Sequence, residues 1–411
     1  MKVVHLASEL SGGAGLAALR LHTTLKENRM DSELVYGYGC YSVAAARRFL
    51  PRTSALVKNL DRILDQLVWR SSRPGAGLFT RTRRLARAGL GEALAGADVV
   101  HLHWVAKWLD VPALFSAIPL STPVVMTLHD TSFVTGGCHQ TDECVAFHEH
   151  CGHCPKLRFA GRWDLSAIGF RQRKNAYQGR TIVAVPTSQW MANHARPAAL
   201  LQNARVAEPI YPGINTSVFR PLHRPTCRDL LGVPADVFVV CAGSADLGNT
   251  GKGMGLLVAA LAALPESLRN RTALLTYGSG VMPGEIDGIR TYHTGYLTSE
   301  RLLSIVYSAA DVFCTPSQME SFGMTAAEAA ACGLPVVAFA TGGLPEIVES
   351  GVNGWLVSTA SVKGLSHALR AAALDPAVRT RCGAEGRRRA EQVFDIRLTA
   401  SRYKALYQSL K

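Results

Sequence analysis

Residues 311–349 read DVFCTPSQMESFGMTAAEAAACGLPVVAFATGGLPEIVE, and this stretch decides how the second half of the chain folds. The apolar runs 311–314 and 334–339 predict two buried strands. The alanine-rich segment between them has high helix propensity, and Gly333 stands where a left-handed residue would end that helix. Two parallel strands joined by a helix form a βαβ unit, whose loops follow the carboxyl ends of the strands.

Two carboxylates frame the loop and helix of this unit, Glu320 at the end of the loop and Glu328 eight positions later. Eight helical positions turn a side chain by roughly 80° beyond two full turns and raise it by ~12 Å. The two carboxylates can therefore face different parts of one elongated ligand. Between them, the free N–H groups of Gly323, Met324 and Thr325 would form an anion site at the helix start. Such a site suits a nucleotide-sugar; the alternative is that both carboxylates are solvated charges on the helix surface.

The chain resembles the retaining glycosyltransferases of family 4, whose E-x7-E signature matches a string of residues in this stretch. They are Glu320-Ser321-Phe322-Gly323, Glu328, Gly333-Leu334-Pro335-Val336-Val337-Ala338, Gly342-Gly343 and Glu346. The resemblance implies the GT-B fold, in which two doubly wound, Rossmann-like α/β domains face each other across a cleft. It also implies a nucleoside diphosphate sugar as donor, with Glu320 orienting the donor sugar in catalysis and Glu328 binding the ribose. Phe322, Gly323, Met324 and Thr325 would then line the donor site.

Length and composition limit the class of protein. The chain has 411 residues, of which 48% are hydrophobic and 18% charged, enough for two domains with large cores. No apolar run reaches 18 residues, so we expect no membrane span, and the run after Met1 is too short for a secretory signal. We therefore expect a cytoplasmic enzyme. Its net charge of +13 favours anionic partners such as nucleotide phosphates, acidic lipid surfaces or nucleic acid.

A Pro/Gly-rich segment around residues 209–221 predicts the crossing between two domains. We expect residues 1–208 to form an acceptor-side domain, on which, by resemblance, a C-terminal helix at 396–411 packs back. Residues 209–395 would form the domain that binds the nucleotide-sugar donor.

Lys252 lies in a Lys-Gly pair between a predicted strand at 237–242 and a predicted helix. A lysine at such a helix start acts as a point charge for a diphosphate. The family pairs this lysine with an arginine just after the strand, where this chain departs from the pattern with Ser244.

By resemblance, a later loop made of Gly295, Tyr296 and Leu297 would hold the nucleobase. The alternative is that these residues form a plain loop with no part in binding.

In the first half, Gly12 and Gly13 belong to a glycine-rich turn that follows the first predicted strand. Such a turn lets the backbone approach a phosphate or sugar closely, and the resemblance places it beside the donor's sugar-phosphate and the acceptor.

His129 ends the predicted strand 123–128, so it points into the cleft. By resemblance, His129 contacts the donor sugar or the acceptor side of the reaction centre; a core histidine is the alternative. His101 and His103 alternate with apolar residues, and we expect one of them to face the cleft.

A cysteine-rich insert follows, with the spacing C-x5-C-x6-C-x2-C. Four sulfurs in so short a segment suit a tetrahedral zinc site, with reduced thiols or disulfides as alternatives. His139, His148, His150 and His153 lie near enough in sequence to substitute as ligands. The resemblance to a branch of family 4 with a TGGCH…CGxCP pattern implies a structural site rather than a catalytic metal. The predicted zinc ligands are Cys138, Cys144, Cys151 and Cys154.

Residues 51–87 carry nine Lys or Arg against two Asp, with leucines and other apolar residues interleaved. Such a basic amphipathic segment can lie on an anionic membrane surface, which would make the protein peripheral at the inner face of the membrane. The alternative is a solvated basic helix packed on the domain. Nucleic-acid binding is not expected, because no recognised module accompanies the charge.

These observations predict a retaining glycosyltransferase that moves a sugar from a nucleoside diphosphate sugar to a hydroxyl of a glycan or lipid-linked acceptor. The family branch favours a role in cell-surface polysaccharide biosynthesis. No cofactor is expected for catalysis, because Lys252 and the helix start near Gly323 would offset the diphosphate charge. The alternatives are a nucleotide-sugar epimerase of the same fold and a non-catalytic module that binds sugar nucleotides or a membrane surface.

Overall fold

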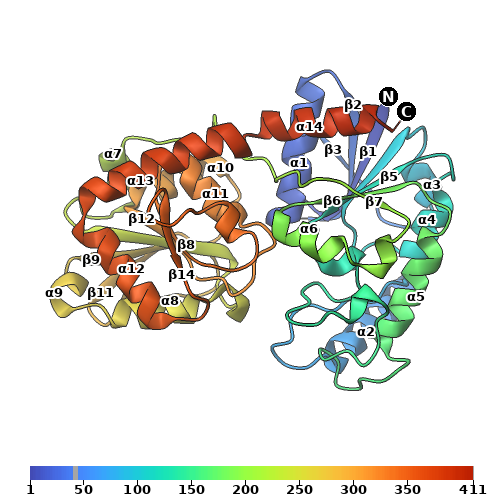
Figure 1. The fold of residues 1–411 in the computed structure, drawn as a ribbon, viewed down its shortest axis with the longest axis horizontal. Helices are drawn as coiled ribbons and strands as arrows, with labels where there is room; N and C mark the ends of the chain where they lie inside the picture. The colour runs from blue at the N-terminus through green and yellow to red at the C-terminus, as the bar shows by residue number, and fades with distance from the viewer. Residues whose placement is uncertain (40–44, 411) are drawn as a thin grey trace. The chain divides into compact units, whose positions relative to one another are not determined.

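Two seven-stranded β-sheets organise the chain, and helices connect most of their strands. The structure is a computed structural model that describes residues 1–39 and 45–410. One unit comprises Met1–Tyr211 with Thr399–Lys411, and the other comprises Pro212–Leu398. The chain passes between the units after Tyr211 and after Leu398. Each of these boundaries lies three residues after the predicted boundary, at 208 and at 395. Figure 1 shows helices on both faces of each sheet, and the predicted α/β class with two doubly wound sheets is confirmed.

The sheet of the first unit has the strand order β3-β2-β1-β4-β5-β6-β7, and all its pairings are parallel. Every residue of β5 and β6 is buried, as expected for strands covered on both faces. The strands are β1 (Lys2–Glu9), β2 (Asp31–Tyr38), β3 (Ala46–Arg48), β4 (Val99–Trp104), β5 (Val124–Leu128), β6 (Ile182–Pro186) and β7 (Arg205–Val206).

Alternate residues of these strands contribute to two different cores. Val124, Met126 and Leu128 of β5 pack with residues of α3, α4, α5 and α6 on one face. Val125 packs with residues of α1 and α14 on the other face. The helices are α1 (Gly12–Glu27), α2 (Ala55–Ser71), α3 (Leu90–Ala93), α4 (Val111–Ala117), α5 (Leu165–Tyr177), α6 (Gln189–Ala195) and α14 (Ile396–Gln408).

The C-terminal helix α14 covers one face of this sheet with two buried tyrosines. The hydroxyl of Tyr407 lies 2.6 Å from Nδ1 of His101, and the hydroxyl of Tyr403 lies 2.6 Å from the hydroxyl of Thr127. Both tyrosines also join the apolar core around Val125. Hydrogen bonds and apolar packing thus both hold α14 on the sheet.

The sheet of the second unit has the order β10-β11-β9-β8-β12-β13-β14. All its pairings are parallel except that of β10 with β11. The strands are β8 (Phe238–Asp246), β9 (Thr272–Ser279), β10 (Glu285–Ile286), β11 (Ile289–His293), β12 (Val312–Thr315), β13 (Val336–Phe339) and β14 (Gly354–Val357). The helices are α7 (Arg224–Leu231), α8 (Met254–Ala262), α9 (Glu266–Arg269), α10 (Glu300–Ala309), α11 (Met324–Ala331), α12 (Val362–Leu374) and α13 (Pro376–Arg389).

The strand order of each sheet reverses at one place, between β1 and β4 in the first unit and between β8 and β12 in the second. In open α/β sheets, ligands bind beyond the carboxyl ends of the strands at such a point. The loops after β8 and β12 are the ones that carry Lys252 and Glu320. The fold therefore brings the two most specific predicted residues to the same edge of one sheet.

A buried carboxylate anchors the start of β12. Oδ2 of Asp311 accepts bonds from Nη2 of Arg228 and from the backbone N–H of Val239, both at 2.8 Å. Oδ1 accepts from Nη1 of Arg224 at 3.0 Å, and Asp311 is 6% exposed. The carboxylate thus ties α7 and β8 to β12.

We predict that Asp311→Ala lowers the free energy of unfolding by about 3–5 kcal/mol, because it leaves the buried guanidinium of Arg228 without its partner. Urea unfolding followed by circular dichroism measures the change. The exposed Asp236 provides the control, since Asp236→Ala should change stability by about 0.5 kcal/mol or less. A loss below about 1 kcal/mol for Asp311→Ala would show that the carboxylate is not an anchor.

Candidate active site

Lys252 and Glu320 form an ion pair at the carboxyl edge of the second sheet. Lys252 ends a 3-10 turn (Thr250–Lys252) that follows β8, and Glu320 lies in the loop that follows β12. Nζ of Lys252 is 2.6 Å from Oε1 of Glu320, and the two side chains are 35% and 16% exposed. The pair is therefore partly open to solvent, and each side chain can exchange its partner in the pair for a group of a ligand.

Close backbone contacts hold the Glu320 loop in place. Gly253 has φ 71°, and a Cβ atom there would lie 2.0 Å from the carbonyl oxygen of Pro316. Gly342 has φ 56°, and a Cβ atom there would lie 1.7 Å from the carbonyl oxygen of Glu320. The N–H of Gly343 donates to that same oxygen at 2.9 Å. Only glycine fits at both positions, so the loop is clamped between the Lys252 turn and the Gly342-Gly343 turn.

Helix α11 starts directly after this loop. Its N-cap is Gly323, at φ 109°, which provides no side chain to cap the helix. The first N–H groups of an α-helix have no partner within the helix, so those of Met324 and Thr325 can bind an anion. The ring of Phe322 is 4% exposed and packs 5.5 Å from the ring of Phe394. Phe322 therefore offers its backbone, not its ring, to a ligand in this loop.

Glu328 points into the domain and is 4% exposed. Its Oε2 accepts a hydrogen bond from the hydroxyl of Tyr307 at 3.2 Å, and that hydroxyl lies 2.6 Å from the hydroxyl of Tyr277. Sequence reasoning identified Glu328 but neither tyrosine. The contact with ribose predicted for Glu328 stays a prediction.

The loop predicted to hold the base follows β11. Gly295 has φ 73°, and its carbonyl oxygen accepts a bond from the N–H of Gly278 at 2.9 Å. The side chain of Tyr296 is 45% exposed, and Leu297 is half-buried. The loop is anchored at Gly295 and leaves the two side chains partly accessible.

In the first unit, helix α1 begins at Gly12, one position after Ser11. Gly12 has φ 74°, which is not helical, so the chain turns at this glycine as it enters the helix, and the contact with a ligand predicted for Gly12 and Gly13 stays a prediction. Gly15 makes the closest approach, since a Cβ atom there would lie 2.2 Å from the carbonyl oxygen of Glu9. This contact brings the start of α1 against the end of β1.

His129 is the last member of a row of three imidazoles, of which the first two are buried. Nδ1 of His5 lies 3.2 Å from Nε2 of His103, and Nδ1 of His103 lies 3.2 Å from Nε2 of His129. The three residues come from β1, from β4 and from the position after β5, so the sheet itself assembles the row. His5 and His103 are 0% and 2% exposed, respectively, whereas His129 is half-buried.

All three imidazoles are neutral near pH 7. Burial lowers the pKa of His5 to about 3, and neighbouring His22 adds to the shift. Burial lowers the pKa of His129 to about 4, although Asp130 acts in the opposite direction. Burial and the adjacent histidines also hold the pKa of His103 well below its usual value. His129 therefore offers a hydrogen bond and not a positive charge.

The row favours one set of tautomers. A neutral imidazole has one N–H and one bare nitrogen, and Nε2 of His5 is buried without a hydrogen-bond partner among the described residues. Buried N–H groups without partners are rare in proteins, which favours a bare nitrogen at this position. His5 then donates to His103, and His103 donates to His129. Among the residues that the structure describes, this leaves Nδ1–H of His129 as a donor without a partner.

His101 lies beside the histidine row. His101 and His103 lie two positions apart on β4, so they share a face, and their ring centroids are 4.1 Å apart. Alternation therefore does not put these two histidines on opposite faces, and whether one of them faces the cleft stays a prediction. Among the described residues, His5, His101 and His103 form the one group of three with potential metal ligands within 4.8 Å. Both nitrogens of His101 are bonded, however, to Tyr407 at 2.6 Å and to Thr127 at 2.7 Å, which identifies a hydrogen-bond network.

Asp130 and His139 form a second polar pair that the sequence did not reveal. Oδ2 of Asp130 lies 2.6 Å from Nδ1 of His139 and accepts a bond from Nε1 of Trp104 at 2.8 Å. Burial acts against the charge, but His139 and the bonds from Ser132 lower the pKa of Asp130 to about 2. Nε2 of His139 lies 2.9 Å from the hydroxyl of Thr80. His139 is therefore occupied on both nitrogens and does not substitute as a zinc ligand.

The four cysteines of the insert line one small cavity of about 20 Å³. The nine cysteines in the described part of the chain are free thiols. A cavity of this size holds one water-sized species, which fits a single ion. The N–H of Gly136 donates to Sγ of Cys151 at 3.3 Å. No three of these sulfurs lie within 4.8 Å of one another, so their side chains would have to turn inward to coordinate one ion. The cavity is lined by Cys138, Cys144, Cys151 and Cys154 among others.

Comparisons with known proteins decide the family. Residues 244–389, which include Lys252, Glu320 and Glu328, match the family described as Glycosyl transferases group 1. A D-inositol 3-phosphate glycosyltransferase of Kribbella flavida is 35% identical over 354 residues, covering 81% of this chain and 76% of that protein. The chain belongs to the group 1 glycosyltransferases. It is therefore an enzyme of the transferase class.

Solved structures share the fold of this glycosyltransferase. The sucrose-phosphate synthase of Thermosynechococcus elongatus has a TM-score of 0.71 at 21% identity, covering 100% of this chain and 99% of that one. Anabaena HepE in complex with UDP-glucose has a TM-score of 0.70 at 20% identity, covering 100% of both chains. At these identities the likeness shows the fold, which is the predicted GT-B fold.

The histidine row predicts how the stability of this glycosyltransferase depends on pH. The folded pKa values of His5 and His129 are about 3 and about 4, below the value of about 6.5 in an unfolded chain. The unfolded state therefore binds more protons below pH ~6.5, and stability falls as the pH is lowered from there towards ~4. Each such histidine contributes a slope of about 1.4 kcal/mol per pH unit.

Urea unfolding at several values between pH 7 and 4.5 measures this slope. His5→Phe should reduce the slope by about one proton, whereas His367→Gln, at an exposed position of α12, should leave it unchanged. An equal slope in the native protein and in His5→Phe would contradict the neutral row.

Proposed function

We propose that the chain is a retaining glycosyltransferase of family 4 that uses a nucleoside diphosphate sugar. One observation carries the proposal: Nζ of Lys252 lies 2.6 Å from Oε1 of Glu320 at the point where the strand order of the second sheet reverses. An ammonium, a carboxylate and the start of α11 thus stand together at one sheet edge. This combination suits a ligand that carries both phosphates and sugar hydroxyls.

Each group has a separate task in this proposal. Lys252 and the N–H groups of Met324 and Thr325 bind the diphosphate, so Lys252 exchanges its carboxylate partner for phosphate oxygens. Glu320 is then free to accept hydrogen bonds from the donor sugar and to orient it. The ammonium of Lys252 and the N–H groups at the start of α11 stabilise the negative charge that develops on the departing diphosphate. Glu328 is assigned to the ribose, and Gly295 with its two neighbours to the base.

The first unit supplies the acceptor side of the reaction in this proposal. His129 donates a hydrogen bond from Nδ1–H to the donor sugar or to the acceptor hydroxyl. The first turn of α1, with Gly12 and Gly13, presents backbone N–H groups to the sugar-phosphate. The leaving phosphate takes the proton of the acceptor hydroxyl, so no separate base is needed.

The acceptor is assigned to the class of glycans or lipid-linked glycans, with a role in cell-surface polysaccharide biosynthesis at the cytoplasmic side of the membrane. The relative from Kribbella flavida is named for inositol 3-phosphate, which makes that compound a second candidate acceptor. Membership of a transferase family argues against a non-catalytic binding module and against an epimerase. Release of nucleoside diphosphate from a panel of UDP- and GDP-sugars, with each acceptor class added in turn, separates these candidates.

Two substitutions test the donor site. We predict that Lys252→Ala raises the KM for the donor by ~10- to 100-fold, because a charged contact to phosphate is lost. Glu320→Gln should lower kcat by ~10²–10³-fold, since the carboxylate that orients the sugar is lost. Steady-state assays of nucleoside diphosphate release measure both values. Lys363→Ala, at an exposed position near the start of α12, is the matched control and should change neither. Unchanged kinetics in both site variants would refute the proposed site.

We also propose that the cysteine cavity holds one structural zinc ion, with no part in the chemistry. Cysteine sulfurs are the ligands that zinc prefers in structural sites, and four cysteines line a cavity that fits one ion. Because the insert spans residues 138–154 with only short helical turns, metal coordination would give it the stability that regular secondary structure does not provide.

Metal analysis of the purified chain should find about one zinc per molecule. Cys144→Ser with Cys154→Ser should abolish binding and lower the melting temperature, as should chelation. Cys227→Ala, a buried cysteine of the other unit, should keep the full zinc content. Less than about half an equivalent of zinc, with every thiol open to titration, would remove this proposal.

A further inference from the structure

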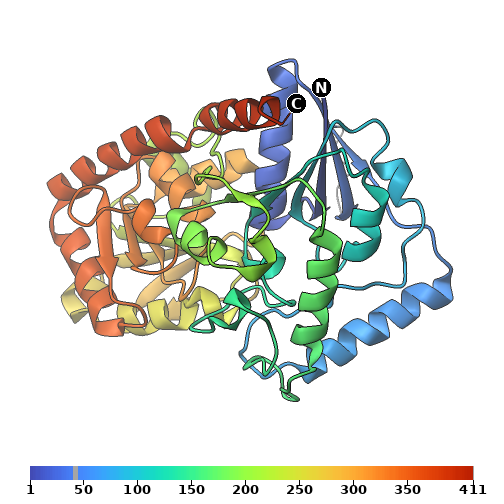
Figure 2. The same cartoon turned by 45° about the vertical axis from the view of Figure 1, so that its right-hand side comes forward.

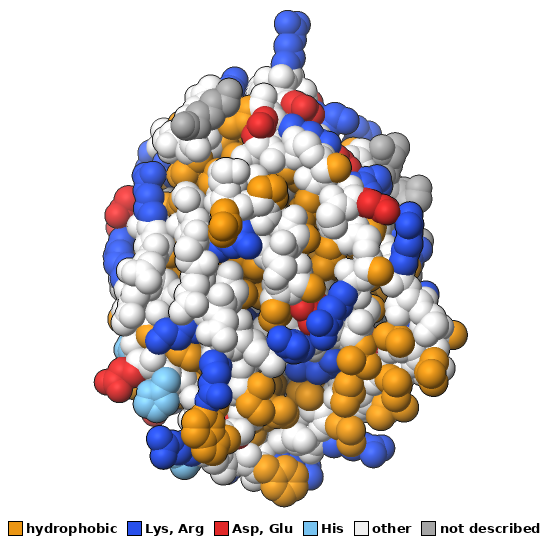
Figure 3. All heavy atoms as spheres, turned by 90° about the vertical axis from the view of Figure 1, so that its right-hand side faces the viewer, with side chains coloured by type: hydrophobic (Ala, Val, Ile, Leu, Met, Phe, Trp, Pro, Cys, Tyr) orange, Lys and Arg blue, Asp and Glu red, His pale blue; other side chains and the backbone are white. Residues whose placement is uncertain are grey.

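Helix α2 exposes an apolar stripe along its length. Leu56, Leu60, Ile63 and Leu67 are 69%, 41%, 51% and 51% exposed. Their spacing of four, three and four residues places them on one helix face. Such a face normally packs on the core of the domain. Figure 2 shows α2, the light-blue helix, along the outside of the first unit. Figure 3 shows one face of the molecule, on which hydrophobic side chains gather at the lower right.

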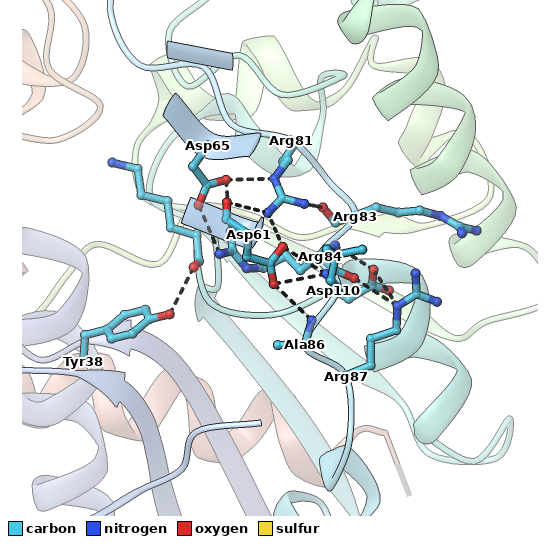
Figure 4. A network of polar contacts seen from close by, with 11 residues as sticks. Tyr38, Asp61, Asp65, Arg81, Arg83, Arg84, Ala86, Arg87 and Asp110 are labelled. Atoms are coloured by element: carbon cyan, nitrogen blue, oxygen red, sulfur yellow. Dashed lines mark hydrogen bonds and ion pairs between the residues drawn. The ribbon is translucent and has the colours of Figure 1, made fainter. Parts of the chain in front are cut away.

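Acidic residues, rather than the apolar stripe, form the inner side of α2. Oδ1 of Asp65 accepts bonds from Nε of Arg81 at 2.8 Å, and Oδ2 from Nη2 of Arg84 at 3.1 Å. Asp61 is 3% exposed and pairs with Arg81. Figure 4 shows these side chains converging between α2 and the segment that follows it.

Asp61 also binds the backbone of that segment. Its carboxylate accepts bonds from the N–H groups of Leu85 and Ala86, each at 3.0 Å. Burial opposes its charge, but the bonds from Arg81 and these N–H groups lower the pKa of Asp61. The carboxylate therefore stays ionised at neutral pH and fixes which side of α2 faces inward.

Two further contacts fix the end of the helix. Val68 is 8% exposed and packs with Phe79, Cys138, Cys154 and Leu157. The N–H of Arg158 donates to the carbonyl oxygen of Ser71 at 2.8 Å. The helix is therefore held at its middle and at its end, and the apolar stripe is presented to solvent as a fixed surface.

The charge around the stripe is strongly positive. The two acids of residues 51–87 are Asp61 and Asp65, and both are occupied by Arg81 and Arg84. The same segment has nine Lys or Arg, and Figure 3 shows blue side chains at the edge of the hydrophobic group. Its exposed cations are Arg52, Lys58, Arg62, Arg70, Arg73, Arg83 and Arg87.

We propose that α2 is a membrane-surface helix that docks this glycosyltransferase on an anionic lipid bilayer. Apolar side chains flanked by cations match a layer of acyl chains beneath negative headgroups. A second copy of the chain does not match, because pairing two copies through this face would bring like charges together. Among the described residues, no helix is long and apolar enough to cross a membrane, so α2 lies in the plane of the interface.

Vesicle sedimentation tests this docking with the purified chain. We expect binding to vesicles of phosphatidylcholine with phosphatidylglycerol, and on the order of 10-fold weaker binding to phosphatidylcholine alone. The triple variant Leu56→Ser, Ile63→Ser, Leu67→Ser should lose binding by on the order of 10-fold or more. Lys58→Glu with Arg62→Glu and Arg70→Glu should lose the preference for anionic vesicles, and salt should weaken binding of the native chain.

Matched controls separate this surface from hydrophobicity in general. Leu120, Leu230 and Leu374 are 65%, 67% and 66% exposed and lie outside the α2 segment of the chain, and changing all three to Ser should leave vesicle binding intact. Melting temperatures of the triple variants should match the native value, because the altered side chains are exposed. Sedimentation velocity gives the oligomeric state. Equal binding by the α2 variant and the control variant would overturn the proposal. So would a native dimer that ignores vesicles and dissociates in the α2 variant, because the stripe would then be a protein interface.

Discussion

Backbone packed directly on backbone positions the Lys252–Glu320 ion pair. At Gly253 and Gly342 the chain passes so close to Pro316 and Glu320 that a Cβ atom at either glycine would clash. The loop that carries Glu320 is held between these two turns, and one turn also carries Lys252. The 2.6 Å ion pair depends on this clamp. Fixed groups of this kind lose little freedom when a ligand binds, which is how preorganised charges stabilise a transition state.

The two units present polar groups of different character. Lys252 and Glu320 are charged and partly exposed, so a ligand can replace each partner by its own phosphate or hydroxyl groups. The row from His5 through His103 to the half-buried His129 is neutral, because desolvation keeps protons off these rings. A neutral row orients His129 without adding a second positive charge. Phosphate binding and hydroxyl orientation are thus assigned to different sets of residues.

Local patterns predicted much of this fold. The two strands and the helix expected within residues 311–349 correspond to β12, α11 and β13, because apolar runs and alanine-rich segments report directly on burial and propensity. The histidine row escaped prediction because it joins β1, β4 and β5, and strand neighbours of this kind are set by topology rather than by nearby sequence. The shared face of His101 and His103 could be read from the sequence, since residues two apart on a strand lie on the same face. The inward ring of Phe322 depends on Phe394, which lies far away in sequence.

Helix α2 shows the limit of pattern reasoning, because amphipathicity reveals two faces but not which one turns inward. Here the decision rests with Asp61 and Asp65, whose partners Arg81 and Arg84 follow the helix in sequence. Leaving four leucine or isoleucine side chains about half exposed forgoes on the order of 1 kcal/mol for each. Folding alone gives no reason for that loss, since a stripe packed on the domain would stabilise it. An orientation fixed by buried ion pairs against the hydrophobic preference is what a surface that serves a partner requires, and the surrounding cations identify an anionic partner.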